Sequence, residues 1–133
     1  MSNTEPFPCV PVSWGELIDK LSILEIKAER LRAPEAVANV RREVALLSAI
    51  LAEQRTHLQE MAALKAALDA VNRRLWDIED AIREKEAAGS FDAAFVDLAR
   101  SVYRANDERS RIKRRINELL RSGIVEEKQY ALY

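Results

Sequence analysis

The chain has 133 residues, of which 48% are apolar and 32% charged, so it is long enough to form one domain with a buried core. The interspersed 21 basic and 22 acidic residues give a net charge of -1, which provides no overall attraction to nucleic acid or to an anionic membrane. The single cysteine, Cys9, excludes an intrachain disulfide and a cysteine metal cluster. We expect a cytoplasmic protein, because the first residues do not resemble a leader and no apolar run could span a bilayer.

The N-terminal third predicts an extended lead-in followed by two antiparallel helices. Three prolines within residues 1–12 are incompatible with a helix there. Ser13 and Glu16 have the spacing of a capping box, so the first helix should run from Trp14 to about Arg32. The second helix should begin at Pro34 after a short connection. The apolar stripes of the two helices are Leu17, Leu21, Leu24, Ala28 and Leu31, widened by Ile18, and Val37, Val40, Val44, Leu47 and Leu51.

The end of the second helix has two interpretations. A polar run precedes Leu58, and the apolar alternation slips once between Met61 and Leu64, which favours a break near residues 54–60. One unbroken helix is the alternative, because neither glycine nor proline occurs between Pro34 and Gly89.

Residues 64–119 predict a long helical hairpin that turns at Gly89–Ser90. The third helix should end at Ala87–Ala88, and the fourth should follow a Ser90 or Asp92 cap and run to about Ser122. The apolar spacing of four and three is typical of coiled-coil packing. Its members are Leu64, Leu68, Val71, Leu75, Ile78 and Ile82, and then Phe91, Phe95, Leu98, Val102, Ala105, Arg109, Ile112, Ile116 and Leu119.

These elements predict an all-α fold, an antiparallel helical bundle of about four helices built on the long hairpin. Residues 1–133 should form a single helical domain, with an extended lead-in at residues 1–12. The tail at residues 124–133 is too apolar to be free, so we expect it to pack on the bundle.

Polar residues in the middle of the hairpin have two main interpretations. Antiparallel pairing places Asn72 beside Asn106 and Leu68 near Arg109, which is the one charged member of either stripe. The favoured interpretation is a buried layer that sets the register, in which Arg109 pairs with an acid of the first or third helix, such as Glu25 or Asp69. A polar pocket at mid-hairpin is the alternative, and a third possibility is that these residues face water.

Other charged clusters give weak functional signals. Asp77, Asp80 and Glu84 have spacings that place carboxylates on one helix face, which with acids of the first helix could hold Mg²⁺. Basic residues nearby favour a solvated surface instead, so we predict no metal site and no cofactor. The basic residues of the fourth helix could bind phosphates, but no aromatic residue lies among residues 111–115, so we do not expect nucleic acid as a partner. Those basic residues are Arg100, Arg104, Arg109, Arg111, Lys113, Arg114, Arg115 and Arg121.

Most of the chain resembles an uncharacterised bacterial family of small all-helical proteins, a domain of unknown function. The resemblance implies a free-standing helical domain of proteobacterial type, and it brings no activity or site residues with it. The segments that carry it are PVSWGELIDKLSILEIKAER, ANVRRE, VNRRLWDIEDAIREKE, FDAAFVDLARSVYRANDERSRIKRRIN and IVEEKQY.

The first functional hypothesis is a helical protein–protein interaction or scaffold module that has no catalytic chemistry and that pairs with a second copy or another protein. No catalytic residue is predicted, because His57 and Cys9 lack any surrounding motif, although an enzyme is not excluded. The alternative is a small-molecule or phosphate-ligand site, with or without catalysis, at a charged mid-hairpin pocket. Its candidate residues are Asp77, Asp80, Tyr103, Asn106, Arg109 and Lys113.

Overall fold

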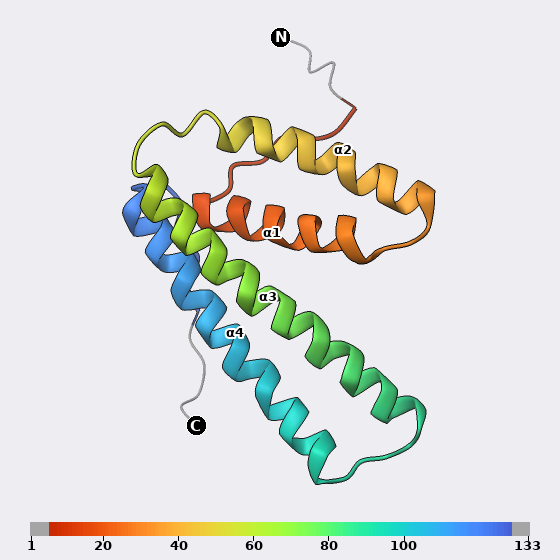
Figure 1. Cartoon of the computed structure of the whole chain (residues 1–133). Coiled ribbons are helices and arrows are strands. Elements are labelled where there is room, and N and C mark those ends of the chain that lie inside the picture. The colour runs from red at the N-terminus through yellow and green to blue at the C-terminus, as the bar shows by residue number, and fades with distance from the viewer. Residues whose placement is uncertain (1–5, 129–133) are drawn as a thin grey trace.

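The computed structural model describes residues 6–128, and Figure 1 shows four helices connected by short segments. Between residues 6 and 128 the structure contains no strand, so the predicted all-α class is confirmed. The helices are α1 (Trp14–Arg30), α2 (Pro34–Leu51), α3 (Leu58–Ala87) and α4 (Ala93–Leu119).

Both predicted N-terminal caps form. The Ser13 hydroxyl accepts a hydrogen bond from the backbone N–H of Glu16 at 3.0 Å, and the Asp92 carboxylate accepts one from Phe95 N–H at 3.0 Å. The Phe95 hydrogen bond lowers the pKa of Asp92 below its ordinary value. Gly89 has a φ of 65° and reverses the chain after α3, as its position in the sequence predicts.

Three helix ends differ from their predicted positions. α1 ends at Arg30 rather than about Arg32, because the residues leading into Pro34 are extended. α2 ends at Leu51 and α3 begins at Leu58, so the favoured break is confirmed and the unbroken helix was wrong. The break lies at residues 52–57, slightly before the predicted 54–60. His57, directly before α3, has a left-handed backbone conformation. α4 ends at Leu119 rather than at the predicted Ser122, and Arg121 just beyond it is also left-handed.

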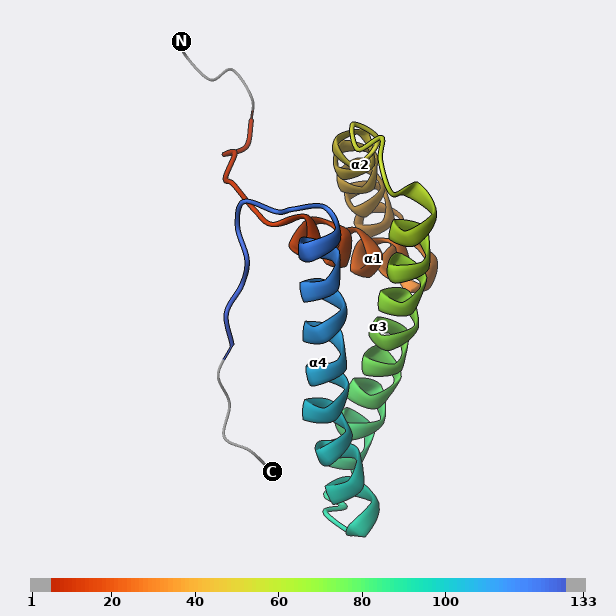
Figure 2. The same cartoon turned by 90° about the vertical axis from the view of Figure 1, so that its left-hand side faces the viewer.

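The first helix occupies the centre of the fold. α3 and α4 form the predicted long antiparallel hairpin, and α1 lies across it near the end opposite the turn (Figures 1 and 2). α1 contacts α2, α3 and α4, whereas α2 contacts only α1 among the helices. The bundle is therefore a short α1–α2 pair crossed over a long α3–α4 hairpin.

The hydrophobic core lies where α1 crosses the hairpin. It comprises Ile18, Leu68, Val71, Ile112 and Ile116. Burying one aliphatic side chain of this size contributes about 1.5–3 kcal/mol. No residue from 73 to 104 is buried, although the predicted stripe continues through this part, which we call the distal arm. Phe91, a predicted stripe residue, is 60% exposed and packs edge-on against Phe95, because it precedes the first turn of α4.

The segments outside the helices lie beside α1 and α4. Residues 6–12 form no helix, as predicted for the lead-in, whose residues 1–5 lie outside the described part. Residues 124–128 turn back along α4 (Figure 2). Ile124 and Val125 are exposed, and the remaining apolar tail residues, at 130–133, lie outside the described part. None of the described helices has the length and apolar character needed to cross a membrane. The cytoplasmic location stays a prediction.

Gly15 allows an unusually close approach between α1 and α4. Its backbone N–H donates a hydrogen bond to Asn117 Oδ1 at 2.7 Å. A Cβ atom at Gly15 would lie 2.6 Å from the Lys113 carbonyl oxygen and 2.9 Å from Asn117 Oδ1. Because the first of these atoms belongs to helical backbone, it cannot move without shifting α4.

We therefore expect Gly15→Ala to lower the free energy of unfolding by about 2 kcal/mol, since overpacking separates α1 from α4. Gly123→Ala is the matched control, because nothing lies within 4 Å of the added Cβ. Its unfolding free energy should stay within about 1 kcal/mol of wild type. Chemical denaturation measures both variants, and equal stability of the two would contradict the close contact.

Candidate functional site

A buried carboxylate lies at the crossing of α1 with the hairpin. Asp19 is 1% exposed, and Arg109 of α4 donates to both of its oxygens, from Nε at 3.0 Å and from Nη2. Asn72 of α3 donates its Nδ2–H to Asp19 Oδ1 at 3.0 Å, and Lys113 Nζ lies 3.8 Å from Oδ2. Side chains from α3 and α4 therefore compensate the negative charge of Asp19 on α1.

The network continues along α3 without a break. Asn72 Nδ2 also contacts Ser22 Oγ at 3.2 Å, and the Ser22 hydroxyl donates to Asp69. Lys65 Nζ lies 3.4 Å from Asp69 and 2.7 Å from Glu25. The polar groups of the α1–α3 contact are thus satisfied by one another.

The favoured interpretation of Arg109 named the correct kind of partner but the wrong residue. Arg109 pairs with an acid of α1, as expected, but this acid is Asp19 and not Glu25 or Asp69. α1 meets α4 at the level of Asp19, and Glu25 lies six residues, or about 9 Å, further along the helix. Glu25 and Asp69 therefore bind Lys65 of α3 instead.

Hydrogen bonding to Asp19 raises the pKa of the Arg109 guanidinium above its ordinary value, against the opposing effect of burial. A group whose folded-state pKa is raised keeps its full contribution to stability below its unfolded-state pKa. For an arginine this limit lies above every pH at which proteins are normally studied. Titration of Arg109 therefore adds no pH dependence to stability in that range.

The structure brings three of the six predicted ligand residues together. Asp80, Asn106 and Arg109 line an open hollow of about 490 Å³ between α3 and α4, together with Asn72 and Trp76. Asn72 and Asn106 thus lie on the same hollow, in agreement with the predicted register. Arg109 Nη1 lies 3.5 Å from Asn106 Oδ1, and its other donors are directed to Asp19.

The other three predicted residues do not line that hollow. Lys113 is buried and donates to Glu16 at 2.7 Å, and Asp77 accepts from Arg30 at 2.6 Å. Tyr103 is 40% exposed on α4. A ligand site built from all six residues stays a prediction, and the contacts of Arg109 and Lys113 are those of a structural network.

Some members of the acidic and basic clusters seen in the sequence form ion pairs with other segments of the chain. Within residues 6–128 no group of three or more potential ligand side chains is placed to hold a metal ion. Glu29 binds Arg73, and this hydrogen bond lowers the pKa of Glu29. Of the basic residues on α4, Arg109 and Lys113 are directed at α1, and Arg114 binds Glu127 at 2.9 Å.

The residue that sequence reasoning missed as the partner of Arg109 is Asp19, together with the face of α1 that carries it. Gly15, Asp19, Ser22 and Ile26 follow the spacing of four, three and four, and all are buried. This face lies two residues, or about 200°, away from the leucine stripe that begins at Leu17. The repeated spacing was a usable signal, but three of its four members are not large apolar residues.

Replacing Arg109 by leucine should lower the free energy of unfolding by about 3–5 kcal/mol, because Asp19 would remain buried without its main partner. Adding Asp19→Leu should recover a large part of this loss, since apolar replacement of both partners is often tolerated. Chemical denaturation of the single and double variants measures the coupling.

Arg74→Leu is the control for loss of an arginine, because the Arg74–Glu108 pair is half exposed. Its stability should lie within about 1 kcal/mol of wild type. A neutral or stabilising Arg109→Leu would contradict the structural role and support a ligand site beside Asn106.

Comparison with known proteins identifies the chain at the level of its family. Searches of curated proteins and of solved structures find no match. The model of one family of unknown function, DUF6165, matches residues 9–132. This match covers nearly the whole chain and agrees with the resemblance seen in the sequence. The chain therefore belongs to the family of unknown function DUF6165.

Proposed function

We propose that the protein is a helical interaction module that pairs with a second copy of itself through the distal arm. The observation that carries the proposal is the absence of any buried side chain among residues 73–104. The apolar stripe continues through the arm, where Leu75, Ile78 and Leu98 remain partly exposed. Two helices alone cannot cover such a stripe, so a further helical surface would complete its burial.

A second apolar face lies on α4 within the arm. Val96, Ala99, Arg100 and Tyr103 have the spacing of one helix face, and all four are exposed. Val96 is 51% exposed and Tyr103 is 40% exposed. A large apolar residue, an alanine and an aromatic residue together form a surface on which another helix can pack closely.

Charge favours α3 of a second copy as the partner of this face. In the described part of the chain, neither Asp80 nor Glu84 on α3 has an ion-pair partner, and Arg100 on α4 has none. Packing α4 of one copy on α3 of another brings opposite charges together, whereas packing α3 on α3 opposes like charges. A two-fold axis would form this contact twice, which is how most homodimers close.

The wild-type protein should sediment with a concentration-dependent mass that approaches twice 15.1 kDa at micromolar concentration. Arg100→Glu should weaken association by about tenfold or more, because like charges then face each other across the contact. Adding Asp80→Lys and Glu84→Lys should restore association, and raising the salt concentration should weaken the wild-type dimer.

The control variant is Arg41→Glu, which reverses an exposed charge on α2 outside the arm. It should leave the sedimentation profile unchanged. A monomer at every concentration, or equal weakening by Arg41→Glu and Arg100→Glu, would contradict the proposed contact.

A further inference from the structure

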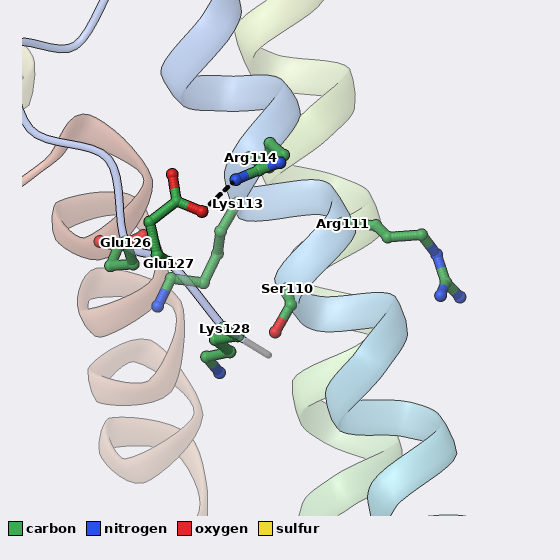
Figure 3. A pocket seen from close by; sticks show the side chains of 7 residues that line it. All are labelled: Ser110, Arg111, Lys113, Arg114, Glu126, Glu127 and Lys128. Carbon is green, nitrogen blue, oxygen red and sulfur yellow. Dashed lines mark hydrogen bonds and ion pairs between the residues drawn. The ribbon is translucent and has the colours of Figure 1, made fainter. Parts of the chain in front are cut away.

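A cavity of about 240 Å³ lies between α4 and the C-terminal segment that turns back beside it (Figure 3). All of its lining residues are polar or charged: Ser110, Arg111, Lys113, Arg114, Glu126, Glu127 and Lys128. The segment forms one wall, and its two glutamates are attached to the helices. Glu126 accepts hydrogen bonds from Ser13 and Asn117, and Glu127 accepts one from Arg114 at 2.9 Å.

Ser110 has a buried hydroxyl that makes no hydrogen bond. Among residues 6–128, Ser110 Oγ is the buried side-chain polar atom that has no partner. A serine inside a helix commonly donates to the carbonyl four residues earlier, and Ser101 does so to Asp97 at 2.9 Å. Ser110 does not, and its hydroxyl is directed towards the cavity (Figure 3). A buried unsatisfied hydroxyl is costly, so a bound group that completes it is favoured.

Two ammonium groups lie on the same side of α4 as this hydroxyl. Lys128 has no ion-pair partner in the described part of the chain, and it lines the same cavity as Ser110. Lys113 Nζ donates to Glu16 at 2.7 Å and lies 3.8 Å from Asp19 Oδ2. An ammonium group has three N–H donors, so Lys113 can still donate to a further acceptor. Arg111 also lines the cavity, but its guanidinium is directed away from these two ammonium groups (Figure 3).

The two carboxylates in the lining form no ion pair with Lys113 or Lys128 in the described part of the chain. Glu127 is bound by Arg114, and Glu126 is bound by Ser13 and Asn117. The groups left with unused hydrogen-bonding capacity are therefore donors: the Ser110 hydroxyl, Lys128 and part of Lys113. Their natural complement is an anion with several acceptor oxygens.

We propose that this cavity binds a phosphate group, either free phosphate or the phosphate of a small monoester, between Ser110, Lys113 and Lys128. The Ser110 hydroxyl and the two ammonium groups each donate to a phosphate oxygen. Because Lys128 belongs to the C-terminal segment, the bound phosphate would also fasten residues 126–128 to α4. The site is independent of the distal arm and of self-association.

The test is a titration of the full-length ¹⁵N-labelled protein with inorganic phosphate, followed by NMR at ionic strength held constant with chloride. Saturable shifts of the Ser110 and Lys128 amide signals are expected. Ser110→Ala and Lys128→Gln should each weaken binding by about fivefold or more, the effect of losing one hydrogen bond to a charged ligand. A parallel titration with glycerol phosphate distinguishes the two possible ligands. Tighter binding of glycerol phosphate than of inorganic phosphate indicates that the site binds a phosphate monoester, and equal or weaker binding indicates that it binds free phosphate.

Arg115→Gln is the matched control, because it removes an exposed positive charge of α4 that is not among the residues lining the cavity. It should leave the affinity within about twofold of wild type, as expected for a screened charge outside the site. Thermal unfolding followed by circular dichroism checks that all three variants are folded. Shifts that do not saturate, or equal weakening by Arg115→Gln and Lys128→Gln, would overturn the proposal.

Discussion

The burial of Asp19 is the constraint on which the arrangement of the helices depends. A carboxylate that is 1% exposed requires nearby donors, and here they come from Arg109 and Lys113 on α4 and Asn72 on α3. α1 can satisfy Asp19 only where α3 and α4 both approach it. A buried ion pair adds little net stability compared with apolar residues of the same shape, but its geometry is directional. We infer that the pair chiefly fixes the position at which α1 crosses the hairpin.

The residues around Asp19 make the same crossing sterically possible. Gly15, one turn before Asp19, lets α1 approach the α4 backbone at Lys113 and Asn117. Ile18 fills the space between the two hairpin helices as part of the core. α1 therefore presents Gly15, Asp19 and the apolar Ile18 to the hairpin, while Leu17 lies with the residues of α2 along an apolar groove. This two-sided burial explains why α1, the shortest of the four helices, contacts all the others.

The spacing of apolar residues in the sequence was sufficient to predict most of the fold. The apolar stripes placed all four helices, and the caps at Ser13 and Asp92 located two of their starts. The position at which α1 crosses the hairpin could not be predicted in the same way, because a search for apolar residues does not find Gly15, Asp19 and Ser22. The partner of Arg109 followed from that crossing, since nothing in the sequence fixes the level at which α1 meets α4.

The crossing also leaves the distal arm uncovered. α1 has 17 residues and α3 has 30, so their lengths are about 26 Å and 45 Å. Even a helix lying parallel to the hairpin could cover little more than half of it, and α1 lies across it instead (Figure 1). α2 cannot make up the difference, because it contacts only α1 among the helices. The interaction that closes the core at the base thus leaves the arm covered by neither α1 nor α2.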